Sequence, residues 1–292
     1  MANANENKMK VFKEETVDAV YQKIQIYRDR GELNFPLNYS PENAMKSAWL
    51  IIQDLVDKDK RPVLEVCTRD SVINALLDMA IQGLNPAKKQ CYFIAYGDKL
   101  TMQRSYFGSI HVAKTVNPNV EEIIGEVVYE GDIFAYKKVR GRTVISNHEQ
   151  KLENINKANI KAAYCSVFYR DGSEDSTIMT FAEIKQAWMQ SKNYPIDDAG
   201  NLKTGSVHNK FTAEMAKKTV ISRACKTIIN SSDDGSLIIR VYKQTEAEAA
   251  EAQAAAEIAE NANKIEIEGT LKDETPASEP AEADAATDGF DA

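Results

Sequence analysis

The spacing of apolar residues changes near residue 91, and this change constrains the fold of the chain most strongly. Before it, apolar side chains recur at the intervals that place them on one face of a helix. After it, short runs such as CYFIAY and KLTMQ carry β-branched and aromatic residues between turn residues. Helical spacing returns near residue 180. We therefore predict an α+β fold, with a central antiparallel group of β-hairpins flanked by helices.

Three helices are predicted ahead of the strands. The first covers residues 11–30. The second begins after Ser40, an N-cap residue type that is followed by Pro41 at the first helical position. The third covers residues 70–83 and ends at Gly83, a residue type that often follows the last turn of a helix.

Turn residues predict two β-hairpins. Gly97-Asp98 separates CYFIAY from KLTMQ, and Asp171-Gly172 separates KAAYCSVFYR from STIMT. The runs EEIIGEVVYE and DIFAYKKV also have strand composition, whereas SNHEQKLENINKAN has the composition of a polar loop. A short helix over residues 106–115 is expected between the first hairpin and these runs.

Two helices are predicted after the strands. Thr180 and Glu183 form a T-x-x-E capping box at the start of FAEIKQAWMQ. A longer helix is expected over residues 209–229, and it contains the cation-rich stretch EMAKKTVISRACK.

Charge is segregated along the chain. Residues 246–292 hold fourteen carboxylates and two lysines, a net charge of −12, so residues 1–245 carry +4 of a whole-chain charge of −8. We therefore divide the chain into a core and an acidic tail at residue 246. The tail has too few apolar residues to bury a core, so we expect disorder from about residue 250, although its start, TEAEAAEAQAAAEIAE, has high helix propensity.

The core itself divides into three parts by composition. Residues 11–90 are predicted to be mainly helical, residues 91–180 rich in β-structure, and residues 180–245 helical with the basic helix. A basic body joined to an acidic tail is a charge asymmetry that favours a nucleic-acid partner.

Cations concentrate in the predicted helix over residues 209–229. Five cations and one carboxylate, Glu214, fall between residues 210 and 226, and apolar residues surround nearly the whole helix. Enclosed cations need anionic partners, and lysine stems can also extend to solvent. A bound polyanion and pairing with distant Asp or Glu residues both remain open. The cations are Lys210, Lys217, Lys218, Arg223 and Lys226.

A second cationic segment follows the third helix. Its cations alternate with aromatic residues, the combination that holds single-stranded nucleic acid by phosphate contacts and base stacking. Core packing of the aromatic rings is the alternative. The cations are Lys88, Lys89, Lys99, Arg104 and Lys114, and the aromatic residues are Tyr92, Tyr96, Tyr106 and Phe107.

Several classes of protein are not supported by the sequence. The four cysteines form no C-x-x-C pair and the three histidines are scattered, so we expect no metal site. No P-loop for ATP, G-x-S-x-G or H-E-x-x-H motif is present, and we expect no catalytic residue. MANANENKMK has no apolar signal-peptide core and no apolar run reaches membrane-spanning length, so we expect a cytoplasmic protein without membrane contact. Asp132, Glu149 and Lys151 loosely fit a metal-dependent nuclease, which stays an alternative.

Three stretches together resemble the RecT family of phage and prophage single-strand annealing proteins, in the RecT/Red-beta superfamily. LTMQRSYFGSIHVAK resembles the family's strand–GY[KR]G–helix segment. EMAKKTVISR resembles its M-A-[KR]-K-T-V-x-R helix, and INALLDMAIQGLNP resembles its apolar helix that ends in Leu-x-Pro. The resemblance covers about residues 40–240 in the family's order.

The resemblance implies an ATP-independent recombinase that binds single-stranded DNA and anneals complementary strands through a duplex intermediate. It implies a homo-oligomer, either a ring or a helical filament, and no cofactor, with the effect of Mg²⁺ left open. It further implies work in homologous recombination and DNA repair in the cytoplasm of a bacterial host. A phage exonuclease and the host single-strand-binding protein are the implied partners.

The resemblance also places the DNA-binding residues. Those on family motif positions are Gln103, Tyr106, Gly108, Lys217, Lys218, Thr219 and Arg223. Phe107 stands where the family commonly has a cation, and Arg104 stands where it commonly has an apolar residue. We therefore expect that Arg104 supplies the relocated cation and that the Phe107 ring stacks on a base. Proximity adds Lys99, Lys114, Lys210 and Lys226.

The acidic tail offers two further expectations. It can restrain non-specific binding by competing for the groove, or it can dock a partner, and we expect it to be dispensable for annealing in vitro. A protein-interaction scaffold that acts through this tail is the third functional alternative, beside the annealing protein and the nuclease.

Overall fold

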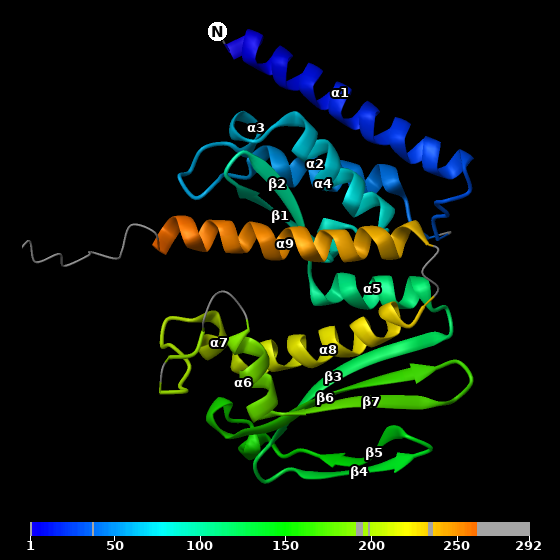
Figure 1. Ribbon diagram of the computed structural model, residues 1–292, viewed down its shortest axis with the longest axis vertical. Helices are drawn as coiled ribbons and strands as arrows, with labels where there is room; N and C mark the ends of the chain where they lie inside the picture. Colours follow the sequence, from blue (N-terminus) through cyan, green and yellow to red (C-terminus); the bar gives the residue numbers. More distant parts are fainter. Residues whose placement is uncertain (1, 37, 191–194, 198, 233–235, 262–292) are drawn as a thin grey trace, which may run out of the picture.

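The computed structural model describes residues 2–36, 38–190, 195–197, 199–232 and 236–261 (Figure 1). Helices and three small antiparallel sheets form an elongated molecule with two lobes (Figure 1). We call residues 2–104 the upper lobe and residues 120–230 the lower lobe, after their places in Figure 1. The α+β class predicted from the sequence is confirmed.

The upper lobe packs helices against a two-stranded β-hairpin. The Ser40 side chain accepts a hydrogen bond from the Asn43 N–H, and the Thr68 side chain caps a second helix at Ser71. Trp49 and Leu76 lie fully enclosed in the core between these helices. The elements are α1 (Ala2–Asp29), α2 (Pro41–Asp54), α3 (Val63–Val66), α4 (Arg69–Ile81), the 3-10 turn Pro86–Lys88, β1 (Cys91–Tyr96) and β2 (Lys99–Arg104).

The lower lobe is built on a three-stranded antiparallel sheet with the order β3-β6-β7 and a separate β4–β5 hairpin. The capping box of Thr180 and Glu183 is formed, and it starts the helix that follows the sheet. The strands are β3 (Val120–Tyr129), β4 (Ile133–Val139), β5 (Arg142–Glu149), β6 (Ile160–Tyr169) and β7 (Glu174–Thr180), with 3-10 turns at Leu152–Asn154 and Lys157–Asn159. The helices are α6 (Phe181–Met189), α7 (Val207–Lys210) and α8 (Thr212–Asn230).

Helix α8 crosses the sheet in close contact. At Gly125 of β3, a Cβ atom would lie 2.6 Å from the Ile221 side chain, so the glycine permits this approach. Val220, Ala224 and Ile229 of α8 are buried in the core. The helix is thereby fixed against the sheet, and a side of α8 that carries Lys218 and Arg223 is directed outward.

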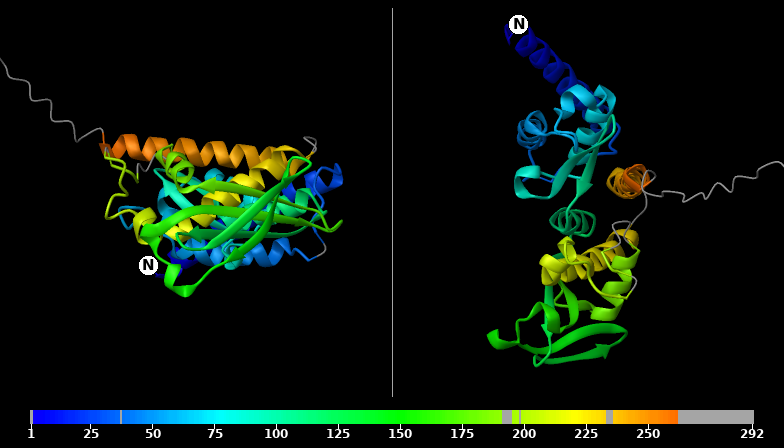
Figure 2. Two further views of the ribbon diagram at one scale, coloured as in Figure 1. Left: turned by 90° about the horizontal axis from the view of Figure 1, so that it is seen from below. Right: turned by 90° about the vertical axis from the view of Figure 1, so that its left-hand side faces the viewer.

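The two lobes meet at a waist. Helix α5 (Tyr106–Val116) lies between them, and α9 (Leu237–Asn261) runs beside α5 (Figures 1 and 2). The first half of α9 is part of the core, since Leu237, Ile239 and Tyr242 are buried.

Three predictions from the sequence need correction. The stretch SNHEQKLENINKAN is not all loop, because its first four residues belong to β5, where a largely exposed hairpin accepts polar side chains. The helix predicted over residues 209–229 is interrupted at Phe211, whose non-helical backbone separates α7 from α8.

The disorder expected from about residue 250 is wrong up to Asn261, since alanine- and glutamate-rich sequence continues α9 across the proposed boundary at residue 246. Residues 262–292 lie outside the described residues.

Candidate nucleic-acid interface

A groove follows the outward face of α8. Residues spaced four apart lie on the same side of a helix, which places Lys218, Ser222 and Lys226 in one row. Helices α6 and α7 form the other wall, with Trp188 and His208. The groove has a volume of about 560 Å³.

A second hollow continues the groove toward the waist. It shares Ser222 and Lys226 with the first and has a volume of about 310 Å³. Its far side is formed by α9, including Glu246, and by Arg104 of β2. The groove therefore has an outer part bounded by α6 and α7 and an inner part bounded by α9.

Lys218 and Arg223 are two of the three exposed cations that line the outer part, and Lys226 is the third. Neither Lys218 nor Arg223 forms an ion pair within 4.0 Å among the side chains that the structure describes. The charge of Glu183 acts on Arg223, but this carboxylate already accepts hydrogen bonds from the backbone N–H and hydroxyl of Thr180. The outer groove therefore presents positive charge to solvent.

Thr219 holds the wall of the groove together. Its hydroxyl donates to the Met215 carbonyl oxygen at 2.8 Å and accepts from Trp188 Nε1 at 2.8 Å. The His208 ring lies edge-on to Trp188, with ring centroids 4.8 Å apart. Burial and the charge of Lys218 lower the pKa of His208, so the ring is neutral at pH 7. Trp188 and His208 were not predicted as site residues, because no local sequence pattern connects them to α8.

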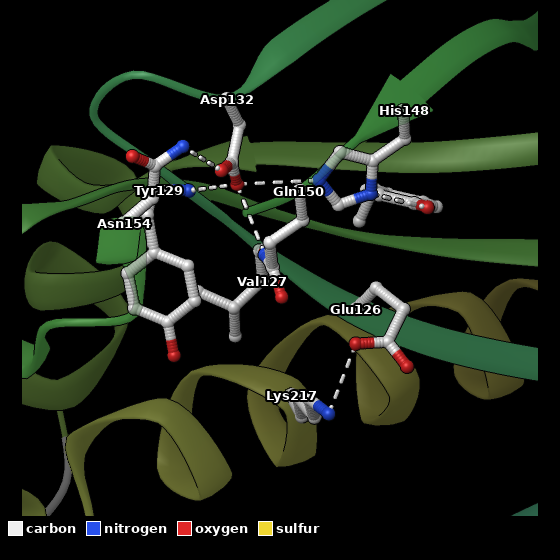
Figure 3. Close-up of polar contacts among 9 residues, drawn as sticks. Glu126, Val127, Tyr129, Asp132, His148, Gln150, Asn154 and Lys217 are labelled. Carbon is white, nitrogen blue, oxygen red and sulfur yellow. Dashed lines mark hydrogen bonds and ion pairs between the residues drawn. The ribbon is translucent and has the colours of Figure 1, made fainter. Parts of the chain in front are cut away.

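Lys217 lies on a different side of α8 from Lys218. Its ammonium group is 3.0 Å from a Glu126 carboxylate oxygen on β3 (Figure 3). Pairing with a distant acid, one of the two alternatives that the sequence left open, therefore accounts for Lys217.

Two more of the predicted cations are paired with α9. Lys226 forms an ion pair with Glu246, and Lys99 Nζ lies 3.6 Å from Glu248 Oε2. Both acids belong to the predicted acidic tail, which begins at residue 246, so part of this tail contacts the predicted DNA-binding residues.

Arg104 is largely enclosed between β2, α4 and α9. Its Nη1 donates to Gln82 Oε1 at 2.6 Å and to Thr245 Oγ1 at 3.2 Å, and its guanidinium lies 3.7 Å from the Tyr242 ring centroid. Burial lowers the pKa of Arg104, which shows that the environment opposes its charge. Through these contacts, Arg104 of the upper lobe binds Thr245 and Tyr242 of α9.

The predicted residues of α5 divide between two faces of the waist. Phe107 is 45 % exposed and, with Lys114, lines a hollow of about 570 Å³ that also includes Lys88. Tyr106 packs against Phe107, with ring centroids 4.1 Å apart. Ser109, on another side of α5, lines the inner groove. The α5 hollow is therefore separate from the α8 groove.

The remaining predicted residues have local roles. Gly108 is buried where a Cβ atom would overlap the Gln90 carbonyl oxygen, and Gln103 donates from its amide to the Tyr96 hydroxyl at 2.7 Å. Lys210 is exposed on α7 and forms no ion pair among the described side chains.

A model of the RecT family matches residues 42–261. The chain belongs to the RecT family. The match includes the α8 groove and α9, and α1 precedes it. No curated protein matches the sequence. RecT family proteins act in DNA recombination by single-strand annealing, and they generally interact with single-stranded DNA and oligomerise.

The residues of the nuclease alternative have separate hydrogen-bond and ion-pair partners in this RecT family chain. Glu149 binds Asn147 through its side chain, and Lys151 lies 4.0 Å from Glu153. Within the described residues there is no group of three or more His, Cys, Asp or Glu side chains that could hold a metal ion.

Asp132 instead organises the β4–β5 hairpin (Figure 3). Its enclosed carboxylate accepts hydrogen bonds from Gln150 Nε2 at 3.0 Å, from the Tyr129 N–H at 2.8 Å and from Asn154 Nδ2 at 2.9 Å. Desolvation raises the pKa of Asp132, but these bonds and His148 outweigh it and lower the pKa to about 2. The carboxylate is thus held ionised by a saturated set of protein donors.

In the part of the chain that is described, helices long and apolar enough to cross a bilayer are absent.

Proposed function

We propose that this RecT family chain binds single-stranded DNA along the α8 groove and anneals complementary strands without ATP. The observation that carries the proposal is the pair of exposed cations, Lys218 and Arg223, in an open groove where no described side chain forms an ion pair with them. A phosphate backbone supplies the missing anions.

The mechanism requires no bond chemistry. When Lys218 and Arg223 contact phosphates, they displace the counterions condensed on the DNA, so the affinity falls as salt rises. Contacts to the backbone rather than to base edges leave the bases free to find a complement. The annealed duplex is then the product, and no cofactor is required.

Assembly extends the groove from one subunit to the next. We propose a ring or helical filament whose subunits hold consecutive nucleotides, so that assembly and binding reinforce each other. The α5 hollow, with Phe107 and Lys114, is a candidate surface for the second strand or for the neighbouring DNA segment.

The biological setting follows from the same proposal. The protein would act in recombination and repair of phage or prophage DNA in the cytoplasm of the bacterial host. A phage exonuclease would supply single strands, and the host single-strand-binding protein would be a further partner.

An annealing assay tests the proposal. Two complementary labelled oligonucleotides are incubated with the full chain in the absence of ATP, with and without Mg²⁺, and strand length and duplex yield are measured. We expect faster duplex formation with strands of unchanged length. Strand shortening with Mg²⁺ would instead support a nuclease. Failure to bind any oligonucleotide at low salt would support a scaffold that acts through the acidic tail.

A further inference from the structure

Helix α9 consists of two halves with different surroundings. Up to Thr245 it contributes buried residues to the core, among them Ile239 and Tyr242. From Glu246 to Ala252, where side-chain surroundings are described, none is buried. We call residues 246–261 the α9 arm. The first half is an anchor, and the arm lies on the surface of the waist.

The arm touches both lobes through carboxylates. Glu246 pairs with Lys226 of α8 in the lower lobe, and Glu248 pairs with Lys99 of β2 in the upper lobe. Two residues apart on a helix, these side chains point in different directions, which is why one helix can contact both lobes. Each carboxylate stands where a phosphate could neutralise the same lysine.

The inner groove lies along the arm. Lys226 lines both the outer and the inner hollow, and the inner hollow is bordered by Glu246, Ala249 and Ala250 of the arm. A strand that follows the row from Lys218 to Lys226 therefore meets Glu246 at its next step. The arm occupies the direct continuation of the proposed strand path.

The two ion pairs are of a kind that a polyanion can displace. The Lys226 side chain is 48 % exposed and that of Lys99 is 54 % exposed, so water and salt screen both pairs. Beneath the arm, Glu248 also acts on Asp78 of α4, whose pKa is raised to about 7 by burial and by the charge of Glu248. The carboxylates of the arm are thus held by two weak, solvent-screened pairs.

We propose that the α9 arm is an anionic cover of the inner groove, and that single-stranded DNA displaces it. The strand first binds Lys218 and Arg223 in the outer groove. Its phosphates then replace Glu246 at Lys226 and Glu248 at Lys99, while Tyr242 and Arg104 keep the anchor in place. Only a DNA strand that is long enough to extend past the outer groove displaces the α9 arm. This inference rests on the proposed function, since it concerns the regulation of the same groove.

The test compares carboxylates of one helix. The double variant Glu246→Gln/Glu248→Gln keeps side-chain size and removes both ion pairs. Glu251→Gln is the matched control, because Glu251 is exposed on the same helix and forms no ion pair among the described side chains. Affinity for a thymidine 30-mer is measured for each full-length protein at low salt. We expect the double variant to bind between about twofold and thirtyfold more tightly, and the control to bind as wild type does.

Hydrogen exchange provides a second, positional readout. We expect the amides of residues 246–252 in the wild type to lose protection when the 30-mer is added, and the amides of residues 237–245 to keep it. Increased protection of the arm would overturn the cover, as would unchanged or weaker binding by the double variant. If the wild type binds no 30-mer, the proposed function fails and the cover fails with it. If the wild type binds the 30-mer and the double variant binds it no more tightly, the proposed cover is refuted and the proposed function is not.

Discussion

Lys217 and Lys218 are adjacent in the sequence but differ in their surroundings. Both lie in the motif that resembles the RecT family, and the sequence offers no means to separate them. The rotation of about 100° between neighbouring helix residues turns Lys217 toward Glu126 and Lys218 into the groove. The anion for one lysine is internal, and we propose that the anion for the other is DNA.

This difference predicts unequal effects of two matched substitutions. Lys218→Ala should reduce the magnitude of the salt slope for binding single-stranded DNA by about 0.7, the value for one phosphate contact. Lys217→Ala removes the same charge from the same helix but should change the slope less, because Glu126 already neutralises it. Gel shifts over a series of salt concentrations measure both. Equal slopes for the two variants would contradict the placement of Lys218.

Gly108 was predicted to contact DNA, but its position gives it a packing role. A Cβ atom there would overlap the Gln90 carbonyl oxygen and lie 2.7 Å from Arg104 Cγ. Gly108→Ala should therefore destabilise the protein by about 2 kcal/mol or more, since backbone must shift. Thermal or urea unfolding measures this loss. Unchanged stability together with weaker DNA binding would favour direct contact with the ligand instead.

At the scale of elements, the sequence predicts best those helix ends that depend on residues close together in the chain. The N-cap at Ser40 and the capping box at Thr180 are present, because each depends on residues three apart in the chain. The break at Phe211 and the strand that contains His148 were missed. The strand depends on tertiary contacts, since His148 Nδ1 lies 3.0 Å from the Tyr164 hydroxyl of another strand.

Helix α9 also predicts a pH dependence through Asp78. The raised pKa means that the folded state prefers the protonated acid, so this stabilisation is complete below about pH 4 and is lost as pH rises through about 7. Glu248 raises this pKa, and Lys99 and Lys23 lower it. The free energy of unfolding should fall by about 1 kcal/mol between pH 6 and pH 8.

Asp78→Asn is the corresponding variant. It should abolish this part of the pH dependence, because the amide does not titrate. Urea unfolding of wild type and variant at both pH values measures the difference. Identical pH profiles for the two proteins would show that Asp78 is not the responsible group.

At the scale of the whole molecule, long-range pairing determines which predicted residues share a surface. Arg104 and Thr245 are 141 residues apart and bond across the waist, and Lys226 meets Glu246 of α9. Charge counting showed an excess of cations in the body and of acids after residue 245, but not which charges meet. Motif resemblance gave the family and the groove-forming helix. The division into an outer groove, a covered inner groove and a separate α5 hollow required the fold.

The most direct test of the central claim uses the folded double variant Lys218→Ala/Arg223→Ala. Its affinity for a thymidine 30-mer and its rate of strand annealing without ATP are compared with those of wild type over a range of salt. We expect a salt slope reduced in magnitude by about 1.4 and slower annealing, with unfolding unchanged. A variant that binds and anneals as wild type does, with the same salt slope, would contradict the claim that the α8 groove holds the strand.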